Sequence, residues 1–185
     1  MITQTRNPRL FLFSIVVLAT LLCAVYVKAA GGKPGLSAGQ KAPAFQAKTV
    51  DGKAVKFPDD YKGKVVLLDF WATWCPPCRA EIPNVVSAYQ KFHANGFEVL
   101  GVSLDQPRTG PELIDFTRKN NMTWPQIYDG KYWEAAVAVQ YGIDSIPHVY
   151  LVDGDTGKIV AEGHDSRGSS LAPAIQKALV AKTKK

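Results

Sequence analysis

Two cysteines, Cys75 and Cys78, are separated by two prolines and directly follow an apolar run. Thiols at this spacing can exchange two electrons as a dithiol and a disulfide. Residues 77–95 have helical spacing, so Cys75 is expected at a helix start, where unpaired amides and the helix dipole favour its thiolate. The sequence therefore predicts thiol–disulfide chemistry, in which Cys75 attacks a partner's disulfide and Cys78 resolves the mixed disulfide.

The residues between the cysteines, Pro76 and Pro77, bear on the direction of the reaction. Neither proline offers a backbone N–H, and both hold φ near the helical value. Fewer donors around the Cys75 sulfur leave its thiolate less stabilised, which favours the disulfide form. We therefore expect the protein to act as a reductant of its partners more than as an oxidant.

A structural disulfide and half of a zinc site are the alternatives for the same cysteine pair. A disulfide between residues this close closes a short loop, and the entropic benefit of a disulfide grows with loop length. A tetrahedral zinc site needs four ligands, but the sequence has no second Cys-x-x-Cys pair, and its three histidines are scattered along the chain. These features favour redox chemistry, and no metal or cofactor is expected.

The cysteine pair lies between an expected strand and an expected helix. Residues 65–71 form a continuous apolar run, typical of a central strand covered on both faces. The Asp51-Gly52 turn predicts a hairpin that leads into a short strand at residues 54–57. Further strands are expected at 97–104, 149–152 and 159–162, and helices at 77–95, 111–119, 133–139 and 171–182. In this order of elements, crossover connections come first and a β-hairpin comes last. Such an order predicts an α/β domain with a mixed sheet and helices on both faces.

Asp69 lies inside the apolar run 65–71. A lone carboxylate in a strand covered on both faces is costly to ionise, so its pKa is expected to rise. A carboxyl group that titrates near neutral pH is suited to general acid–base catalysis. The alternative is a strand-end aspartate whose oxygens are satisfied by backbone groups and water.

Residues 10–28 form a nearly unbroken apolar segment that follows two arginines. About 18 apolar residues suffice for a helix that spans a bilayer, so the segment predicts a signal-anchor behind a cytoplasmic n-region at 1–9. Residues 29–41 then form a flexible tether, and residues 42–185 one folded domain on the outer side of the cell membrane, in the periplasm or its equivalent. The alternative is cleavage near Ala29 and secretion to the periplasm.

The charge balance gives no support for a nucleic-acid partner. The formal net charge is +6, from 22 basic and 16 acidic residues, and three of the basic ones belong to the N-terminal segment. Much of the remaining excess lies in the C-terminal tail, at Lys182, Lys184 and Lys185. Binding of nucleic acid needs a clustered basic face with aromatic or motif support, so no nucleic-acid partner is expected.

The segment 65–83, which contains Phe-Trp-Ala-Thr-Trp-Cys-Pro-Pro-Cys-Arg-Ala-Glu-Ile-Pro, resembles membrane-tethered or secreted thioredoxin-like proteins of the TlpA/ResA type. Further motifs follow in the order that this family shows: Lys41-Ala42-Pro43-Ala44-Phe45, Asp51-Gly52-Lys53, Gly63-Lys64, Gly101-Val102-Ser103-Leu104-Asp105 and Tyr141-Gly142-Ile143-Asp144-Ser145-Ile146-Pro147. The resemblance runs from about Ala42 to the C-terminus. It implies a thioredoxin-like fold within the thioredoxin and peroxiredoxin superfamily.

The resemblance implies roles for residues far from the cysteines in sequence. Pro147 would follow a cis peptide bond and lie against the cysteine pair, which leaves the backbone of Ile146 free to pair with a bound polypeptide. His148 would then lie at the rim of the site. The expected substrate-binding residues are Trp74, Pro76, Pro77, Ile146 and Pro147.

Two acids complete the site that the resemblance implies. Asp69 matches the buried aspartate of thioredoxins, which is thought to manage the proton of the second cysteine; many proteins of the TlpA/ResA type have asparagine there, so aspartate favours thioredoxin-like reduction. Glu81, three residues after Cys78 on the same helical face, matches a glutamate that the family uses near its active site. Its structural alternative is a first-turn acid that complements the helix dipole. The expected catalytic residues are thus Cys75, Cys78, Asp69 and Glu81.

The function that this reading predicts is an outward-facing thiol–disulfide oxidoreductase. It would reduce disulfides in partner proteins, with apocytochrome c during cytochrome c maturation as a candidate, take electrons from an upstream membrane thiol reductant, and act as a monomer. Two alternatives remain open. A thiol peroxidase of the peroxiredoxin type would place threonine three residues before its cysteine, where this chain has Ala72. A non-catalytic peptide-binding module would use the cysteines only as a staple.

Overall fold

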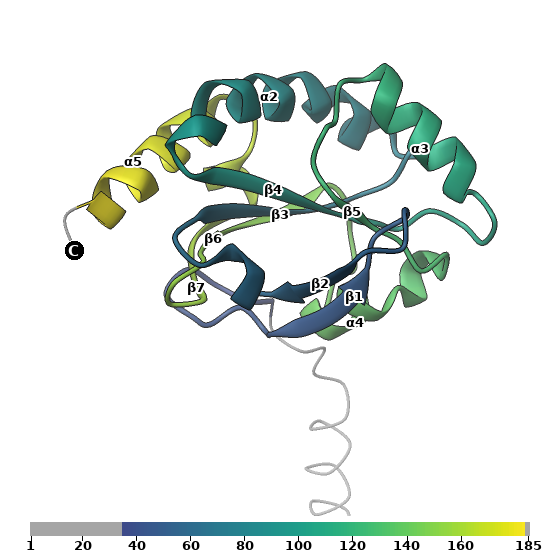
Figure 1. Ribbon diagram of the computed structural model, residues 1–185, viewed down its shortest axis with the longest axis horizontal. Coiled ribbons are helices and arrows are strands. Elements are labelled where there is room, and N and C mark those ends of the chain that lie inside the picture. The colour runs from purple at the N-terminus through teal and green to yellow at the C-terminus, as the bar shows by residue number, and fades with distance from the viewer. Residues whose placement is uncertain (1–34, 184–185) are drawn as a thin grey trace, which may run out of the picture. The chain divides into compact units, whose positions relative to one another are not determined.

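Residues 35–183 are described by the computed structural model of this chain (Figure 1). The strands are β1 (Phe45–Lys48), β2 (Ala54–Phe57), β3 (Val65–Trp71), β4 (Phe97–Ser103), β5 (Gln126–Ile127), β6 (His148–Asp153) and β7 (Lys158–Glu162). The helices are α2 (Pro76–Phe92), α3 (Gly110–Lys119), α4 (Ala136–Tyr141) and α5 (Leu171–Thr183). The expected membrane segment 10–28 lies outside the described residues, and within residues 35–183 no helix is both long and apolar enough to cross a bilayer.

Five of the strands form one mixed sheet in the order β5-β4-β3-β6-β7. β3 lies at its centre, parallel to β4 and antiparallel to β6. All seven residues of β3 are buried, as expected for a strand covered on both faces. The predicted mixed sheet is therefore confirmed, and its central strand leads directly to the cysteine pair.

Helices cover both faces of this sheet (Figure 1). The connections β3-α2-β4 and β4-α3-β5 step in the same direction across the sheet, and because such crossovers are right-handed, α2 and α3 lie on one face. α5 packs beside α2, whereas α4 and the β1-β2 hairpin cover the opposite face. Side chains of β3 alternate accordingly: the ring centroids of Phe70 and Tyr141 in α4 lie 5.3 Å apart, and those of Trp71 and Phe116 in α3 lie 5.7 Å apart. The predicted α/β class is confirmed.

The helix α2 begins at the cysteine pair. Cys75 is its N-cap, with extended backbone, and the two prolines occupy the first two helical positions, where a missing N–H costs no intrahelical hydrogen bond. The helix starts at Pro76, one residue before the predicted start. After a 3₁₀ turn, Gly96 ends the segment with a φ of 94°, which glycine adopts at little cost. The residues that α2 buries are Cys78, Ile82, Val85, Ala88 and Phe92.

The strands β1 and β2 pair antiparallel on either side of the Asp51-Gly52 turn, so the predicted hairpin is confirmed, and they form a sheet of their own. The strand β5 was not expected, since its two residues are too few to show a periodic pattern, yet it extends the main sheet beside β4. The helix expected at 133–139 is a 3₁₀ turn at Tyr132–Glu134 followed by α4.

The ordered domain begins before residue 42, inside the segment expected to be a flexible tether. The Gly39 amide donates to the Ile159 carbonyl at 2.8 Å, and the Ile159 amide donates to the Gln40 carbonyl at 2.9 Å. Lys41 forms an isolated bridge with Lys158. Residues 39–41 therefore pair with β7 as part of the domain.

Candidate active site

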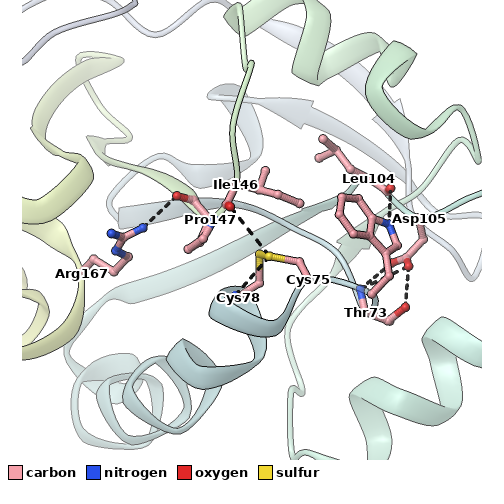
Figure 2. The surroundings of a disulfide bond; sticks show 9 residues. Thr73, Cys75, Cys78, Leu104, Asp105, Ile146, Pro147 and Arg167 are labelled. Carbon is pink, nitrogen blue, oxygen red and sulfur yellow. Dashed lines mark hydrogen bonds between the residues drawn. A yellow bond between two sulfur atoms is a disulfide. The ribbon is translucent and has the colours of Figure 1, made fainter.

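Cys75 and Cys78 form a disulfide at the start of α2, with their Cα atoms 5.3 Å apart (Figure 2). Both residues are buried, whereas Pro76 and Pro77 between them are exposed. The Cys78 amide donates to the Cys75 sulfur at 3.2 Å. Because the prolines lack N–H groups, this is the first amide of the helix that can donate to that sulfur. The predicted position of Cys75 at a helix start is confirmed.

The peptide bond between Ile146 and Pro147 is cis, as the family resemblance implies. The Ile146 carbonyl oxygen lies 3.8 Å from the Cys75 sulfur (Figure 2). A disulfide sulfur carries no hydrogen, so this is a contact in the oxidised protein that becomes a possible S–H···O bond after reduction. Within residues 35–183 the Ile146 amide donates no hydrogen bond. The loop thus lies against the cysteine pair, and its Ile146 amide has no partner within the described chain.

Asp69 is buried in β3 and faces the layer that contains α2. Burial raises the pKa of its carboxyl to about 7, the nearby Glu81 carboxylate adds to this rise, and the Arg167 guanidinium opposes it. Within residues 35–183 no donor forms a hydrogen bond with the carboxyl oxygens. The backbone partners that the alternative reading of Asp69 expects are therefore absent within residues 35–183. Burial raises the pKa of the Asp69 carboxyl, as the sequence predicts.

Glu81 reaches across from α2 to the segment 163–170, which precedes α5. Its Oε2 accepts a hydrogen bond from the Gly168 amide at 3.0 Å and another from the Asn84 side chain at 3.3 Å. The first turn of α2 contains no acidic residue, so the reading of Glu81 as a first-turn acid is wrong. Instead, Glu81 joins the helix that carries the cysteines to the segment beside the cis-proline.

Arg167 is a site residue that the sequence analysis does not identify. Its Nη1 donates to the Pro147 carbonyl at 2.9 Å (Figure 2). Its Nη2 lies 3.2 Å from His164 Nδ1. Together, the Arg167–Pro147 and Gly168–Glu81 hydrogen bonds connect the cis-proline loop to α2. A single arginine in a stretch of small and polar residues gives no motif from which this role could be read.

His148 follows the cis-proline and is half-buried, which agrees with its expected place at the rim. Burial lowers its pKa. Its Nε2 has no hydrogen-bond partner within the described chain. Across residues 35–183, no group of three or more His, Cys, Asp or Glu side chains is placed to hold a metal ion.

An aromatic cluster of Trp74, Tyr132 and Trp133 lies next to Cys75. Trp74 is 39% exposed, and its ring centroid lies 5.1 Å from that of Tyr132 and 6.0 Å from that of Trp133. The Trp74 indole donates to the Leu104 carbonyl at 3.1 Å. Trp74 thus borders the site as predicted, while Tyr132 and Trp133, separated from it by more than fifty residues, join it only in the fold.

The turn before Cys75 is held by Asp105, which sequence reasoning also missed. Its buried carboxylate accepts hydrogen bonds from the Thr73 hydroxyl at 2.6 Å and from the Thr73 amide at 3.2 Å (Figure 2). The Ser103 hydroxyl donates to the same carboxylate at 2.7 Å. These bonds tie the end of β4 to the turn that carries the nucleophile.

The fold and the site together define a class of protein. A Cys-x-x-Cys pair at the start of the helix after the central strand, with a cis-proline against it, is the arrangement of a thioredoxin-like thiol–disulfide oxidoreductase. Residues 38–162 match the model of the AhpC/TSA family, and the chain belongs to this family.

Named relatives and solved structures agree with this class. Thiol-disulfide oxidoreductase ResA of Bacillus subtilis (strain 168) is 30% identical over 159 residues, which cover 84% of this chain and 84% of ResA. The thioredoxin domain of a thiol-disulfide oxidoreductase from Bacteroides vulgatus aligns with a TM-score of 0.67 and 34% identity, over 78% of this chain and 99% of that one.

A thiol:disulfide interchange protein from Bacteroides sp. aligns with a TM-score of 0.65 and 34% identity, over 77% of this chain and 90% of that chain. These likenesses confirm the resemblance to the TlpA/ResA type. The protein is a thioredoxin-like protein-disulfide oxidoreductase whose paired cysteines are Cys75 and Cys78.

Proposed function

We propose that this protein reduces disulfides of partner proteins on the outer side of a cell membrane. The observation that carries the proposal is the position of the Cys75–Cys78 disulfide at the N-terminus of α2 against the Ile146 carbonyl. A polypeptide that pairs with the free Ile146 amide would bring its own disulfide to Cys75. Trp74 and the two prolines, which are exposed beside the sulfur, extend this surface.

The reaction begins from the dithiol form. The Cys75 thiolate attacks one sulfur of the partner's disulfide, which forms a mixed disulfide and releases a partner thiolate. Asp69 in its ionised form then takes the proton of Cys78, whose thiolate attacks the Cys75 sulfur and releases the second partner thiolate. The partner gains two electrons, and the enzyme is left with the Cys75–Cys78 bridge seen in the structure. Two electrons from a thiol reductant restore the dithiol.

The direction of transfer follows from the donors around Cys75. Only one helix amide, that of Cys78, donates to its sulfur, because Pro76 and Pro77 occupy the two preceding helical positions. A thiolate with fewer donors is less stable relative to the disulfide, so the dithiol gives up electrons more readily. The enzyme is therefore proposed to be a reductant.

A redox titration against glutathione tests this direction. We expect a midpoint potential well below about −150 mV, away from the range of strong oxidants. In Pro77→Ala a second amide can donate to the Cys75 sulfur, and we expect the midpoint to rise by about 30 mV or more. A wild-type midpoint near or above −150 mV would overturn the proposed direction.

We propose the partners from the family resemblance. The substrate would be a disulfide-bearing protein, with apocytochrome c before haem attachment as one candidate. Electrons would come from a membrane thiol reductant. The chain is proposed to act as a monomer and to bind no nucleic acid.

The membrane anchor is proposed from the apolar segment 10–28. We expect the full chain to stay in the membrane fraction after alkaline carbonate extraction, and a variant without residues 1–34 to be released. In intact spheroplasts, added protease should digest the domain, which places it outside. Recovery of a mature chain that starts near Ala30 would instead support cleavage and secretion.

A further inference from the structure

Gln126 in β5 is a buried polar residue that the mechanism above does not use. Its carboxamide lies directly over Gly101 of β4, because a Cβ atom added at Gly101 would meet the Gln126 Oε1 at 1.9 Å and its Nε2 at 3.0 Å. Any side chain at position 101 would displace this amide. The glycine therefore provides the space in which the Gln126 side chain crosses from β5 towards β3.

The orientation of this amide is fixed by Trp71. The Trp71 indole Nε1 donates a hydrogen bond to the Gln126 Oε1 at 2.9 Å. An indole N–H can only donate, so the oxygen of the amide must face Trp71 and the nitrogen must point elsewhere. Within the described chain, that Nε2 is buried and has no hydrogen-bond partner. A buried donor without an acceptor is costly, so a partner is expected.

The strand register places Asp69 in the same row. Asp69 pairs with Gly101, and Gly101 pairs with Gln126, so all three residues face the same side of the sheet. Neighbouring strands lie about 4.8 Å apart. Gly101, in the middle of the row, has no side chain to separate the side chains of Asp69 and Gln126. The register thus places the carboxyl group of Asp69 and the unpartnered amide donor of Gln126 on one side of the sheet, with a glycine between them.

We propose that Gln126 is a positioning residue for the proton on Asp69, whose ionised carboxylate accepts a hydrogen bond from the Gln126 Nε2, directly or through one water. This inference rests on the proposed function, because it assigns Asp69 the proton of Cys78. A donor to the carboxylate favours its ionised form. Asp69 could then accept the Cys78 proton near neutral pH despite its burial.

The other charged groups around Asp69 act on the same equilibrium. From α2, the Glu81 carboxylate opposes ionisation of Asp69, whereas Arg167 from the segment 163–170 favours it. Two further groups on α2 are Cys78, which is held in the disulfide, and Arg79. The Arg79 guanidinium lies over the Phe116 ring, 5.7 Å from its centroid. Gln126 is the neutral donor that the strand register places in the same row as Asp69.

NMR titration of the oxidised protein tests the contact without any partner. The side-chain amide resonances of Gln126 and the ¹³C carboxyl resonance of Asp69 are followed between about pH 5 and pH 9. We expect both to move with one midpoint, with the amide proton shifting downfield as Asp69 ionises. In Asp69→Asn the shift of Gln126 should vanish. A Gln126 amide that stays constant while Asp69 titrates would overturn the proposal.

Substitution of Gln126 gives a second, independent result. Gln126→Met keeps an unbranched side chain of similar length without a donor, and we expect the Asp69 midpoint to rise by about one pH unit or more. The matched control is Trp124→Phe. It removes an indole donor that, like the Gln126 amide, is buried without a partner in the described chain, and it should leave the Asp69 midpoint unchanged. A folded Gln126→Met protein with the wild-type midpoint would contradict the proposal.

Failure of this inference and failure of the proposed function are distinguishable. The titrations use the disulfide form and need no substrate, so they report on Gln126 even if the protein reduces no partner disulfide. If Gln126→Met does not fold, the wild-type titration with its Asp69→Asn control still shows whether the Gln126 amide responds to ionisation of Asp69. A wild-type protein that shows the coupled titration but no reductase activity would overturn the function alone.

Discussion

Replacement of Cys75 by serine is expected to abolish disulfide reduction, whereas replacement of Cys78 by serine is expected to trap the partner. Cys75 lies at the helix start against the Ile146 carbonyl, where an incoming disulfide would arrive. Without its thiolate no mixed disulfide forms. Without Cys78 the mixed disulfide forms but is not resolved, since resolution needs the second thiol. Turnover falls to background in both variants, but only Cys78→Ser accumulates a covalent adduct.

The measurement is insulin reduction with dithiothreitol as electron donor, combined with non-reducing electrophoresis of extracts from cells of the native organism that express each variant. The Cys75→Ser, Cys78→Ser double variant is the matched control, because it can neither attack nor trap. Adducts that form equally in Cys75→Ser would show that Cys78 is the attacking thiol. The partners trapped by Cys78→Ser identify the natural substrates directly and test apocytochrome c as a candidate.

The same proteins separate the competing functions. A thiol peroxidase would consume peroxide at the expense of dithiothreitol, and the family to which the chain belongs makes this a necessary comparison. The residue three positions before Cys75 is the buried Ala72, which offers no hydroxyl. A peptide-binding module would retain partner binding in Cys75→Ser without covalent adducts, and its wild type would not reduce insulin.

The parts of the fold that could be predicted are those encoded in local patterns. β3 is recognisable because seven consecutive residues are buried by layers on both faces, which selects a continuous apolar run. The start of α2 is recognisable because prolines at the first two positions and an apolar spacing beyond them are helix signals. Both signals meet at Cys75, so the nucleophile and its helix were predictable together.

The parts of the site that could not be predicted depend on contacts between distant segments. Arg167 bonds to Pro147 from a stretch without a motif, and Tyr132 reaches Trp74 from a 3₁₀ turn. Gln126 lies in a two-residue strand, where no period can be seen, and its place in one row with Gly101 and Asp69 exists only through the register of three strands. Sequence patterns report local geometry, whereas a row such as Asp69, Gly101 and Gln126 forms only when distant strands pair.

These long-range contacts converge on one carboxyl group. Glu81 and Arg167 belong to the hydrogen-bonded bridge between α2, the segment 163–170 and the cis-proline loop, and both alter the pKa of Asp69 in opposite directions. A partner that displaces the cis-proline loop would move Arg167 relative to Asp69. Under the proposed mechanism, binding of a partner and proton transfer by Asp69 would then be linked through shared residues.

Asp69→Asn is expected to slow substrate reduction several-fold near pH 7, because asparagine cannot accept the Cys78 proton. The measurement is the second-order rate constant for reduction of a disulfide substrate by the pre-reduced protein between about pH 5 and pH 9. The wild-type rate should rise through about pH 7, where Asp69 ionises, and the variant should lack this step. An unchanged rate in Asp69→Asn would remove Asp69 from the mechanism.

The same substitution should stabilise the oxidised protein at alkaline pH. Burial raises the pKa of Asp69 from 3.8 to about 7, so the folded state binds a proton that the unfolded state has lost. The free energy of unfolding therefore decreases as pH rises from about 4 to 7, by at most about 4 kcal/mol. Asp69→Asn has no such group, so we expect its advantage over the wild type to grow across this window and to remain constant above it.

Denaturant unfolding of the oxidised proteins at several pH values measures this difference. The comparison is made between variant and wild type because His148, whose pKa burial lowers, changes stability in the opposite direction and cancels between them. The matched control is Asp115→Asn on the exposed side of α3, where Asp115 pairs with Arg118. Exposed ion pairs contribute little, so this control should show no pH-dependent gain. A gain for Asp69→Asn that does not change with pH would mean that the Asp69 carboxyl titrates alike in the folded and unfolded chain.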